Sequence, residues 1–169
     1  MSGILPFRLG IGDDLHRLEV GRRLILGGIE IPFEKGLAGH SDADVLIHAV
    51  IDALTGAAGL PDIGQLFPDT EARWKDASSA TLLALVVKQV EEAGYRPAQV
   101  EVIIHAQAPR LAPYKKAICE RMADLLGIKE EDFNVKAKTG EGLGEVGRGE
   151  AISAQALCVV VRHCQHDTA

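Results

Sequence analysis

Two nearly continuous apolar runs, at residues 102–104 and 157–161, constrain the fold of this 169-residue chain more than any other feature. A strand that is apolar on both sides is buried on both faces of its sheet. Helices can cover one face, and another subunit can cover the second. The two runs therefore predict a layered α/β protein and indicate an oligomer.

The rest of the chain alternates between strand and helix patterns. Strands are expected at 7–15, 100–106, 133–138 and 151–162, with a hairpin at 24–31 whose two-glycine turn supplies positive φ angles. Helices are expected from a cap at Ser41 or Asp42 to 56–59, from a cap at Ser78 or Ser79 to 92, and at 114–126, with loops at 35–41, 62–75 and 140–149. The sequence thus predicts one α/β (α+β) domain over 1–169, with a mixed β-sheet, helices packed on one face and a polar tail at about 163–169.

Charge and hydropathy limit the partners. The net charge of -6 argues against nucleic acid and anionic membranes, because both favour a basic surface. No apolar run approaches the roughly 20 residues of a membrane helix, and the first residues lack a secretory pattern. We expect a cytoplasmic protein, or a plastid one if a transit peptide has been removed. The three cysteines are odd in number and form no CxxC pair, which argues against a disulfide framework. Cys119 and Cys158 stand among apolar residues and are expected to be small buried hydrophobes.

Asp14-Leu15-His16 is the first candidate for chemistry. Alternate residues of a strand share a face, so Asp14 and His16 point one way and Leu15 is expected to point into the core. A carboxylate beside an imidazole provides two of the three protein ligands that a catalytic zinc site takes. His48, one helical turn after Asp44, is the candidate third ligand. The alternatives are a surface pair at 14 and 16 and a core histidine at 48.

Two further segments suggest recognition of a polar ligand. His40 and Ser41 stand just before a helix, whose N-terminus attracts anions, although simple capping also explains them. The segment 62–70 combines carboxylates, a glycine and an aromatic residue, a set suited to a diol. A turn-rich surface connection is the alternative reading of 62–70.

The last two segments suggest a nucleotide. Two prolines stiffen 106–113, and a rigid backbone can hydrogen-bond the edge of a nucleobase, although a rigid turn has the same pattern. In the glycine-rich segment 136–150, backbone N–H groups can approach phosphate oxygens. Lys138 and Arg148 add charge there, Thr139 a hydroxyl, and Glu141 a carboxylate for a hard cation such as Mg²⁺. It is not a Walker loop, and a flexible hairpin loop is the alternative.

Taken together, these segments resemble the methylerythritol cyclodiphosphate synthase family, from Phe7 to about Arg162. The matching blocks are DLH at Asp14, GHSDADVLIHAVIDAL from Gly39, LPDIGQLFPDT from Leu60, AQAPRLAP from Ala106, and KAKTGEGLG through GRGE. The resemblance implies a homotrimer with active sites between neighbouring subunits. It also implies a cyclising, CMP-releasing phosphorus–oxygen lyase of non-mevalonate isoprenoid biosynthesis. Its substrate would be 4-diphosphocytidyl-2-C-methyl-D-erythritol 2-phosphate.

The same resemblance suggests roles for individual residues. It implies one zinc ion per subunit on Asp14, His16 and His48, and Mg²⁺ or Mn²⁺ held with the substrate diphosphate by Glu141. It implies catalytic roles for His40 and Thr139. The positions that match substrate-binding residues are Asp14, His16, Ser41, Asp62, Ile63, Gly64, Phe67, Pro68, Asp69, Thr70, Glu71, Ala106, Gln107, Ala108, Pro109, Arg110, Leu111, Ala112, Lys138, Gly140, Glu141 and Arg148.

The chain departs from the family pattern at three positions. Many relatives carry a histidine where Ile11 stands and aromatic residues where Asp13 and Glu145 stand. All three positions lie away from the matched metal ligands. Two alternatives to the synthase stay open: a zinc-dependent phosphohydrolase, in which a metal-bound water attacks and the product is linear, and a nucleotide-binding scaffold that needs no metal.

Overall fold

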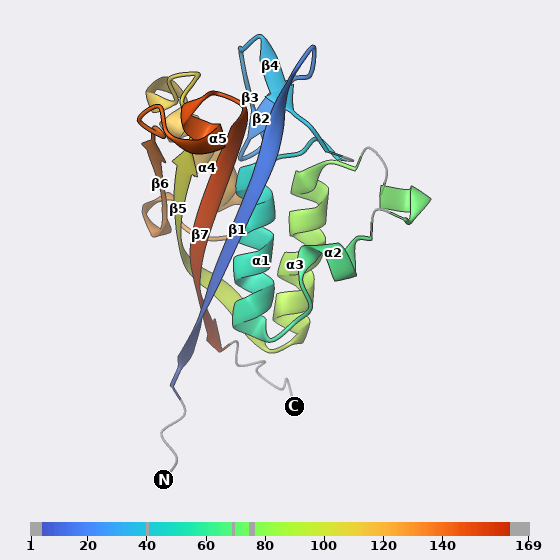
Figure 1. Cartoon of the computed structure of the whole chain (residues 1–169). Coiled ribbons are helices and arrows are strands. Elements are labelled where there is room, and N and C mark those ends of the chain that lie inside the picture. The colour runs from blue at the N-terminus through green and yellow to red at the C-terminus, as the bar shows by residue number, and fades with distance from the viewer. Residues whose placement is uncertain (1–4, 40, 69, 75–76, 163–169) are drawn as a thin grey trace, which may run out of the picture.

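The computed structural model describes residues 5–39, 41–68, 70–74 and 77–162. One five-stranded sheet and a layer of helices make up most of it (Figure 1). The elements are β1 (Phe7–Val20), β2 (Leu24–Leu26), β3 (Ile29–Ile31), β4 (Lys35–Leu37), α1 (Val45–Ala58), α2 (Ile63–Leu66), α3 (Ser79–Glu92), β5 (Tyr95–His105), α4 (Lys115–Leu126), β6 (Phe133–Lys138), α5 (Gly144–Gly147) and β7 (Ala151–Arg162). Short 3-10 helices lie at Ala72–Trp74, Ala112–Tyr114 and Glu130–Asp132.

The strand order β4-β1-β7-β5-β6 makes a mixed sheet, because β5 and β6 run parallel and the other neighbours antiparallel. β1 and β7 are paired along most of their length, from Phe7 opposite Val161 to Arg17 opposite Ala151. The helices α1 and α3 lie side by side on the same face of the sheet (Figure 1). The predicted α+β architecture, with a mixed sheet and helices on one face, is confirmed.

Helix α1 is the centre of the core and is buried along nearly all its length. It rests directly on β1, at two glycines that face it. A Cβ added at Gly10 would lie 1.9 Å from the carbonyl oxygen of Ala53, and one at Gly12 would lie 2.2 Å from that of Ala49. The helix backbone therefore occupies the space that a side chain would need.

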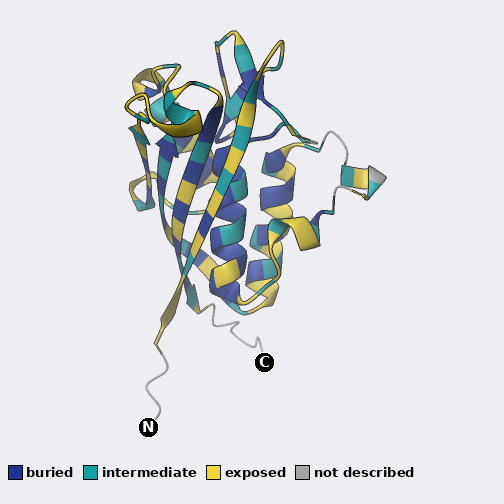
Figure 2. Cartoon of the chain, viewed as in Figure 1, coloured by how far each residue is buried: buried dark blue, intermediate teal, exposed yellow. Residues whose placement is uncertain are grey.

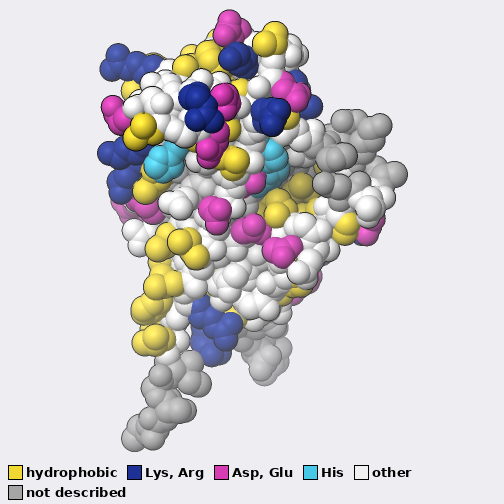
Figure 3. Space-filling view, in the orientation of Figure 1, with side chains coloured by type: hydrophobic (Ala, Val, Ile, Leu, Met, Phe, Trp, Pro, Cys, Tyr) yellow, Lys and Arg dark blue, Asp and Glu magenta, His cyan; other side chains and the backbone are white. Residues whose placement is uncertain are grey.

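The opposite face of the sheet is open and carries apolar side chains (Figures 2 and 3). Leu9, Ile11 and Leu15 on β1 are 58%, 73% and 50% exposed, and Leu157 on β7 lies opposite Ile11. The prediction that Leu15 points into the core was wrong. The alternation along β1 is as expected, but the face with Asp14 and His16 is the one that meets the helices, so Leu15 points outward.

Several boundaries differ from those predicted. β1 continues to Val20, β5 begins at Tyr95, and residues expected in loops form β4, α2 and α5. The cap of α1 is Asp44, not Ser41 or Asp42. Asp44 Oδ1 accepts from the N–H of Ile47 at 3.2 Å, and its two oxygens also accept from Gly27 and Gly28 in the hairpin turn. This buried carboxylate thus joins the start of α1 to the hairpin.

The other predicted caps and ends agree with the structure. Ser78 is the N-cap of α3, although its side chain makes no capping hydrogen bond. Gly59 and Gly127 end α1 and α4 in the left-handed conformation, and Gly94 follows α3 with φ of +83°. Among the described residues, no helix is long and apolar enough to cross a membrane. The predicted polar tail at 163–169 lies outside the described residues.

Candidate functional site

The three predicted metal ligands lie together. Asp14 and His16 come from β1 and His48 from the first turn of α1, where the two elements pack on each other. Asp14 Oδ2 is 2.9 Å from His16 Nε2 and 3.0 Å from His48 Nδ1, and the two nitrogens are 3.1 Å apart. His48 is mostly buried, but both its nitrogens face polar atoms. It is therefore not an ordinary core histidine.

The donor set fits a zinc ion. Zinc bonds to nitrogen and oxygen of about 2.0–2.1 Å in a tetrahedron separate the ligand atoms by roughly 3.3 Å. The triangle of Asp14, His16 and His48, with sides of 2.9–3.1 Å, is slightly tighter than that. Two imidazoles and one carboxylate also match the three-ligand composition of catalytic zinc sites, which leave a fourth position for substrate or water.

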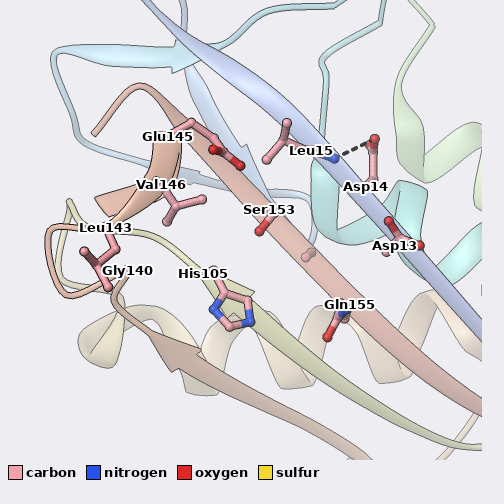
Figure 4. Close-up of a pocket in the computed structure, with 12 residues that line it drawn as sticks. Asp13, Asp14, Leu15, His105, Gly140, Leu143, Glu145, Val146, Ser153 and Gln155 are labelled. Atoms are coloured by element: carbon pink, nitrogen blue, oxygen red, sulfur yellow. Dashed lines mark hydrogen bonds between the residues drawn. The ribbon is translucent and has the colours of Figure 1, made fainter. Parts of the chain in front are cut away.

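Each donor is oriented by a second hydrogen bond. Asp14 Oδ1 accepts from the N–H of Leu15 at 2.8 Å, the dashed line in Figure 4, which leaves Oδ2 for the histidines. His16 Nδ1 lies 2.7 Å from the carbonyl oxygen of Ala38 and must carry the proton, so Nε2 keeps the lone pair that can bind a metal. His48 Nε2 faces the hydroxyl of Ser79 at 3.0 Å. Such contacts fix the tautomer of metal-binding imidazoles.

Asp14 and His16 shift each other's pKa values. Burial would raise the pKa of Asp14, but its close contacts with His16 and His48 outweigh that effect and hold the pKa well below its usual range. Burial would lower the pKa of His16, but the hydrogen bond with Asp14 and its negative charge raise the pKa overall.

A pocket of about 300 Å³ adjoins the three donors. Besides Asp14 and His16, four residues predicted to bind substrate line it: Ser41, Ile63, Gly64 and Phe67. It also contains Gly39, Asp52, Trp74 and Leu82, which sequence reasoning missed. The predicted site of the metal and that of the small polar group are thus one cavity.

Asp52 is the most informative of the missed residues. It stands four residues after His48 in α1, so the spacing alone would have placed both on one helix face. Its Oδ1 accepts from the N–H of Ile63 at 2.8 Å and so holds α2 against α1. Burial raises its pKa, only partly offset by that hydrogen bond.

Other residues of the predicted diol segment do not line this pocket. Asp62 caps α2, where its carboxylate accepts from the backbone and side-chain nitrogens of Gln65 at 2.9 and 3.1 Å. Glu71 pairs with Arg73, and Pro68 and Thr70 lie outside the pocket lining. His40 and Asp69, predicted as catalytic and substrate-binding residues, lie outside the described residues.

The predicted nucleotide segment lines a separate cavity of about 260 Å³. Parallel pairing of β5 and β6 brings the two parts of it together, since the N–H of Ala106 donates to the carbonyl oxygen of Lys138 at 2.9 Å. The Ala108–Pro109 peptide is cis. The predicted residues in the lining are Ala106, Gln107, Pro109, Arg110, Leu111, Ala112, Lys138 and Thr139, whereas Ala108 is not part of it. This cavity shares no lining residue with the pocket beside the metal ligands.

The glycine-rich segment is compact. Gly140 faces the backbone of Gly147, where an added Cβ would lie 2.5 Å from the nitrogen, so the loop closes on itself around α5. The Thr139 hydroxyl donates to Glu141 at 2.5 Å, and Glu141 has a φ of +49°. Arg148 forms two hydrogen bonds of 2.9 Å with Glu150, both exposed.

The same loop borders the open face of the sheet. Figure 4 shows the pocket there, into which His105, Glu145, Ser153 and Gln155 project from the loop and the neighbouring strands. Asp13 and its neighbour Asp14 on β1 are also part of the pocket lining. The phosphate-type loop and the strand with two metal ligands thus border one surface.

Fold and donor cluster together define a class of protein: a single-domain α+β protein with a three-ligand site suited to a divalent metal, beside a pocket for a small ligand. Residues 7–161 match the model of the YgbB family. The chain therefore belongs to the YgbB family.

Relatives of known name agree with this membership. The chain is 56% identical over 154 residues to the 2-C-methyl-D-erythritol 2,4-cyclodiphosphate synthase of Moorella thermoacetica, covering 91% of this chain and 94% of that one. It is 52% identical over 161 residues to that of Desulfosudis oleivorans, covering 95% and 96%. A solved structure of a synthase of this name, in a CDP-bound form, superimposes with a TM-score of 0.84 at 37% identity, covering 90% of this chain and 99% of that one.

Proposed function

We propose that this protein converts 4-diphosphocytidyl-2-C-methyl-D-erythritol 2-phosphate to 2-C-methyl-D-erythritol 2,4-cyclodiphosphate and CMP, in non-mevalonate isoprenoid biosynthesis. The observation that carries the proposal is the convergence of Asp14, His16 and His48 beside a pocket, in a chain 56% identical to a synthase of that name. Bacterial relatives support a cytoplasmic location. The net charge of -6 supports a small-molecule substrate over nucleic acid or membrane.

In the proposed reaction an oxygen of the 2-phosphate attacks the β-phosphorus. A new P–O bond closes the ring, and the bond from that phosphorus to the oxygen of the CMP phosphate breaks, with the electron pair leaving on CMP. Because the substrate attacks itself, no side chain has to act as nucleophile. The protein's task is to hold anionic groups close together, which is catalysis by positioning and electrostatic stabilisation.

Different residues would hold the metal ions and the different parts of the substrate. A zinc ion on Asp14, His16 and His48 would supply Lewis acidity and a positive charge for phosphate oxygens. The pocket with Ser41 and Phe67 would orient the methylerythritol part. Residues 106–112, with Lys138 and Thr139, would hold the cytidine and its phosphates. Glu141 would hold Mg²⁺ or Mn²⁺ on the diphosphate, which is the usual way Mg²⁺ binds, with few carboxylates and substrate oxygens.

We further propose a homotrimer with active sites between subunits. The two cavities of one chain share no lining residue, and a second copy could bring the nucleotide cavity of one subunit to the metal pocket of another. The open sheet face with Leu9, Ile11 and Leu157 supports this arrangement, because such a face requires cover. Arg148, predicted as a substrate-binding residue, lines a pocket beside this face.

Phosphorus NMR of the purified protein with the substrate, Zn²⁺ and Mg²⁺ tests the function. The synthase predicts two coupled cyclic-diphosphate resonances together with CMP. A zinc-dependent phosphohydrolase, the alternative that the metal triad also suits, predicts a linear product from attack by water. Folded, zinc-loaded protein that gives no cyclic product would refute the proposal.

A pair of neighbouring variants tests the metal's part in this function. Asp14→Asn removes a charged donor, so we expect weaker zinc binding and turnover lower by about 100-fold or more. Asp13→Asn makes the same change on the other face of β1, at a residue outside the group of three donors found among the described residues, and is expected to keep the zinc affinity of the natural protein. Equal zinc affinity in both variants would contradict the assignment of Asp14.

A further inference from the structure

His48 is the one of the three metal-binding residues whose orienting contact comes from a side chain outside the triad. Its Nε2 lies 3.0 Å from the hydroxyl oxygen of Ser79, the first residue of α3. Ser79 has no exposed surface. By contrast, the orienting contact of His16 is the backbone carbonyl of Ala38, and that of Asp14 is the N–H of Leu15.

The contacts of Ser79 determine where its single hydroxyl proton goes. Its Oγ–H donates to Asp42 Oδ1, and its backbone N–H donates to Asp42 Oδ2 at 3.1 Å. Since the ionised carboxylate can only accept, the hydroxyl must be the donor in that bond. The serine oxygen then has only lone pairs for His48, so His48 Nε2 must carry the proton.

A protonated Nε2 leaves the Nδ1 of neutral His48 with a free lone pair. Nδ1 is the atom that stands 3.0 Å from Asp14 Oδ2 and 3.1 Å from His16 Nε2. The chain from carboxylate to hydroxyl to imidazole therefore selects the tautomer of His48 that can bind a metal. A carboxylate at the end of such a chain also makes the imidazole a stronger donor.

We propose that Ser79, at the start of α3, and Asp42, in the loop before α1, form a positioning pair for the metal centre, which fixes the ring orientation and the tautomer of His48. The pair acts through His48 and does not touch substrate. Ser41 is a weaker partner, because its Oγ is 3.4 Å from His48 Nε2 and already accepts from the N–H of Ala43 at 3.0 Å. The proposal rests on the metal-binding part of the proposed function.

The test is the zinc affinity of metal-free protein, measured by competition with a chromophoric chelator. We expect Ser79→Ala to weaken zinc binding by about 10–100-fold, the usual effect of removing such a partner. Ser78→Ala is the matched control: it changes the adjacent serine, whose side chain makes no capping hydrogen bond, and should keep the natural affinity. Asp42→Asn should give an intermediate loss, because an amide offers one acceptor oxygen for two donors.

A second measurement separates positioning from support of the helix. The thermal midpoint of each variant is recorded without metal and with saturating zinc. If Ser79 and Asp42 merely start α3, the variants lower the metal-free midpoint and keep both the zinc affinity and the zinc-induced rise, which would overturn the proposal. If Ser79→Ala does not fold, Asp42→Asn decides by the same comparison.

Cobalt substitution gives a spectroscopic outcome. Wild-type protein loaded with Co²⁺ should show the visible absorption of a tetrahedral site, and Ser79→Ala should lose intensity or shift while Ser78→Ala does not. Natural protein that bound neither metal would refute the metal site and the positioning pair together. Natural protein that binds zinc, with a Ser79→Ala variant that binds it equally well, would refute the pair alone.

Discussion

A methyl group at position 12 should force β1 and α1 apart. The added Cβ of Gly12→Ala would lie 2.2 Å from the carbonyl oxygen of Ala49 and 2.6 Å from the nitrogen of Ala53. Ordinary van der Waals contact begins at 3.4 Å, so the first contact is too short by roughly 1.2 Å. Both neighbours are backbone atoms, and no rotamer change can relieve the overlap. Overpacking typically costs about 1–3 kcal/mol, and we expect the upper end or more because a whole helix must move.

The displacement should also open the metal site. His48 precedes Ala49 in α1, whereas Asp14 and His16 belong to β1, so separating the two elements separates the donors. A movement of about 1 Å would widen the triangle from about 3 to about 4 Å, beyond the roughly 3.3 Å that tetrahedral zinc requires. Misplacement on this scale can lower turnover by about 100-fold. We therefore expect loss of zinc affinity and of activity together with loss of stability.

Urea unfolding of the metal-free protein and chelator competition measure the two effects. Gly56→Ala is the matched control: it lies in the same helix, where an added Cβ meets nothing within 4 Å. That variant should be more stable by about 0.4–1 kcal/mol, since alanine limits the unfolded chain. If Gly12→Ala unfolds at the same urea concentration as the natural protein and binds zinc equally well, the close backbone packing of α1 against Gly12 of β1 is refuted.

Three further predictions concern ionisation and the open face. In metal-free protein, hydrogen bonding raises the pKa of His16, so the contribution of His16 to stability is full below pH 6.5 and is lost as pH rises through its folded-state pKa. The pKa of Asp14 is lowered, so the contribution of Asp14 is present above pH 3.8 and is lost as pH falls through its folded-state pKa. Urea midpoints measured across pH in a chelator should thus decline on both sides, and a flat profile on the alkaline side would contradict the role given to His16. Cys158 is fully buried and burial raises its pKa, so iodoacetamide should modify it only after denaturation, as mass spectrometry can show; modification of the folded protein would contradict its burial. Ile11→Asp places a charge on an apolar face and should convert the proposed trimer into 18.0 kDa monomers, measured by light scattering, whereas Leu85→Asp on α3 should not. An unchanged mass for Ile11→Asp would contradict an interface on this face.

The sequence predicted those parts of the fold whose causes are local. Apolar runs and glycine stops located the long strands and helices, and the two-glycine turn located the hairpin. The strand β4 was missed because Lys35-Gly36-Leu37 has no periodic pattern and is a strand only through its pairing with Leu18, Glu19 and Val20. Leu15 was assigned to the wrong face for a related reason: alternation gives two faces, but only the packing of α1 decides which is the core.

The site shows the same division between local and distant causes. The triad could be proposed because Asp14 and His16 alternate on a strand and His48 stands one helical turn after Asp44, and the resemblance to a known family matched all three residues to its metal ligands. Asp52 could have been found from its i,i+4 spacing to His48. Ser79 could not, because its contact with His48 joins residues 31 apart through the packing of two helices. Sequence patterns identify donors more readily than the groups that hold them.

The pairing of β1 with β7 has a consequence for how this chain can be cut and joined. Phe7 stands opposite Val161 in register, so the outer ends of the two strands lie about 5 Å apart, the spacing of neighbouring strands. The glycine-rich loop follows β6 and returns into the other end of β7, by Ala151. A circular permutant that joins these ends by a short linker and opens the chain at the exposed turn near Lys129 would keep every strand pair of the sheet.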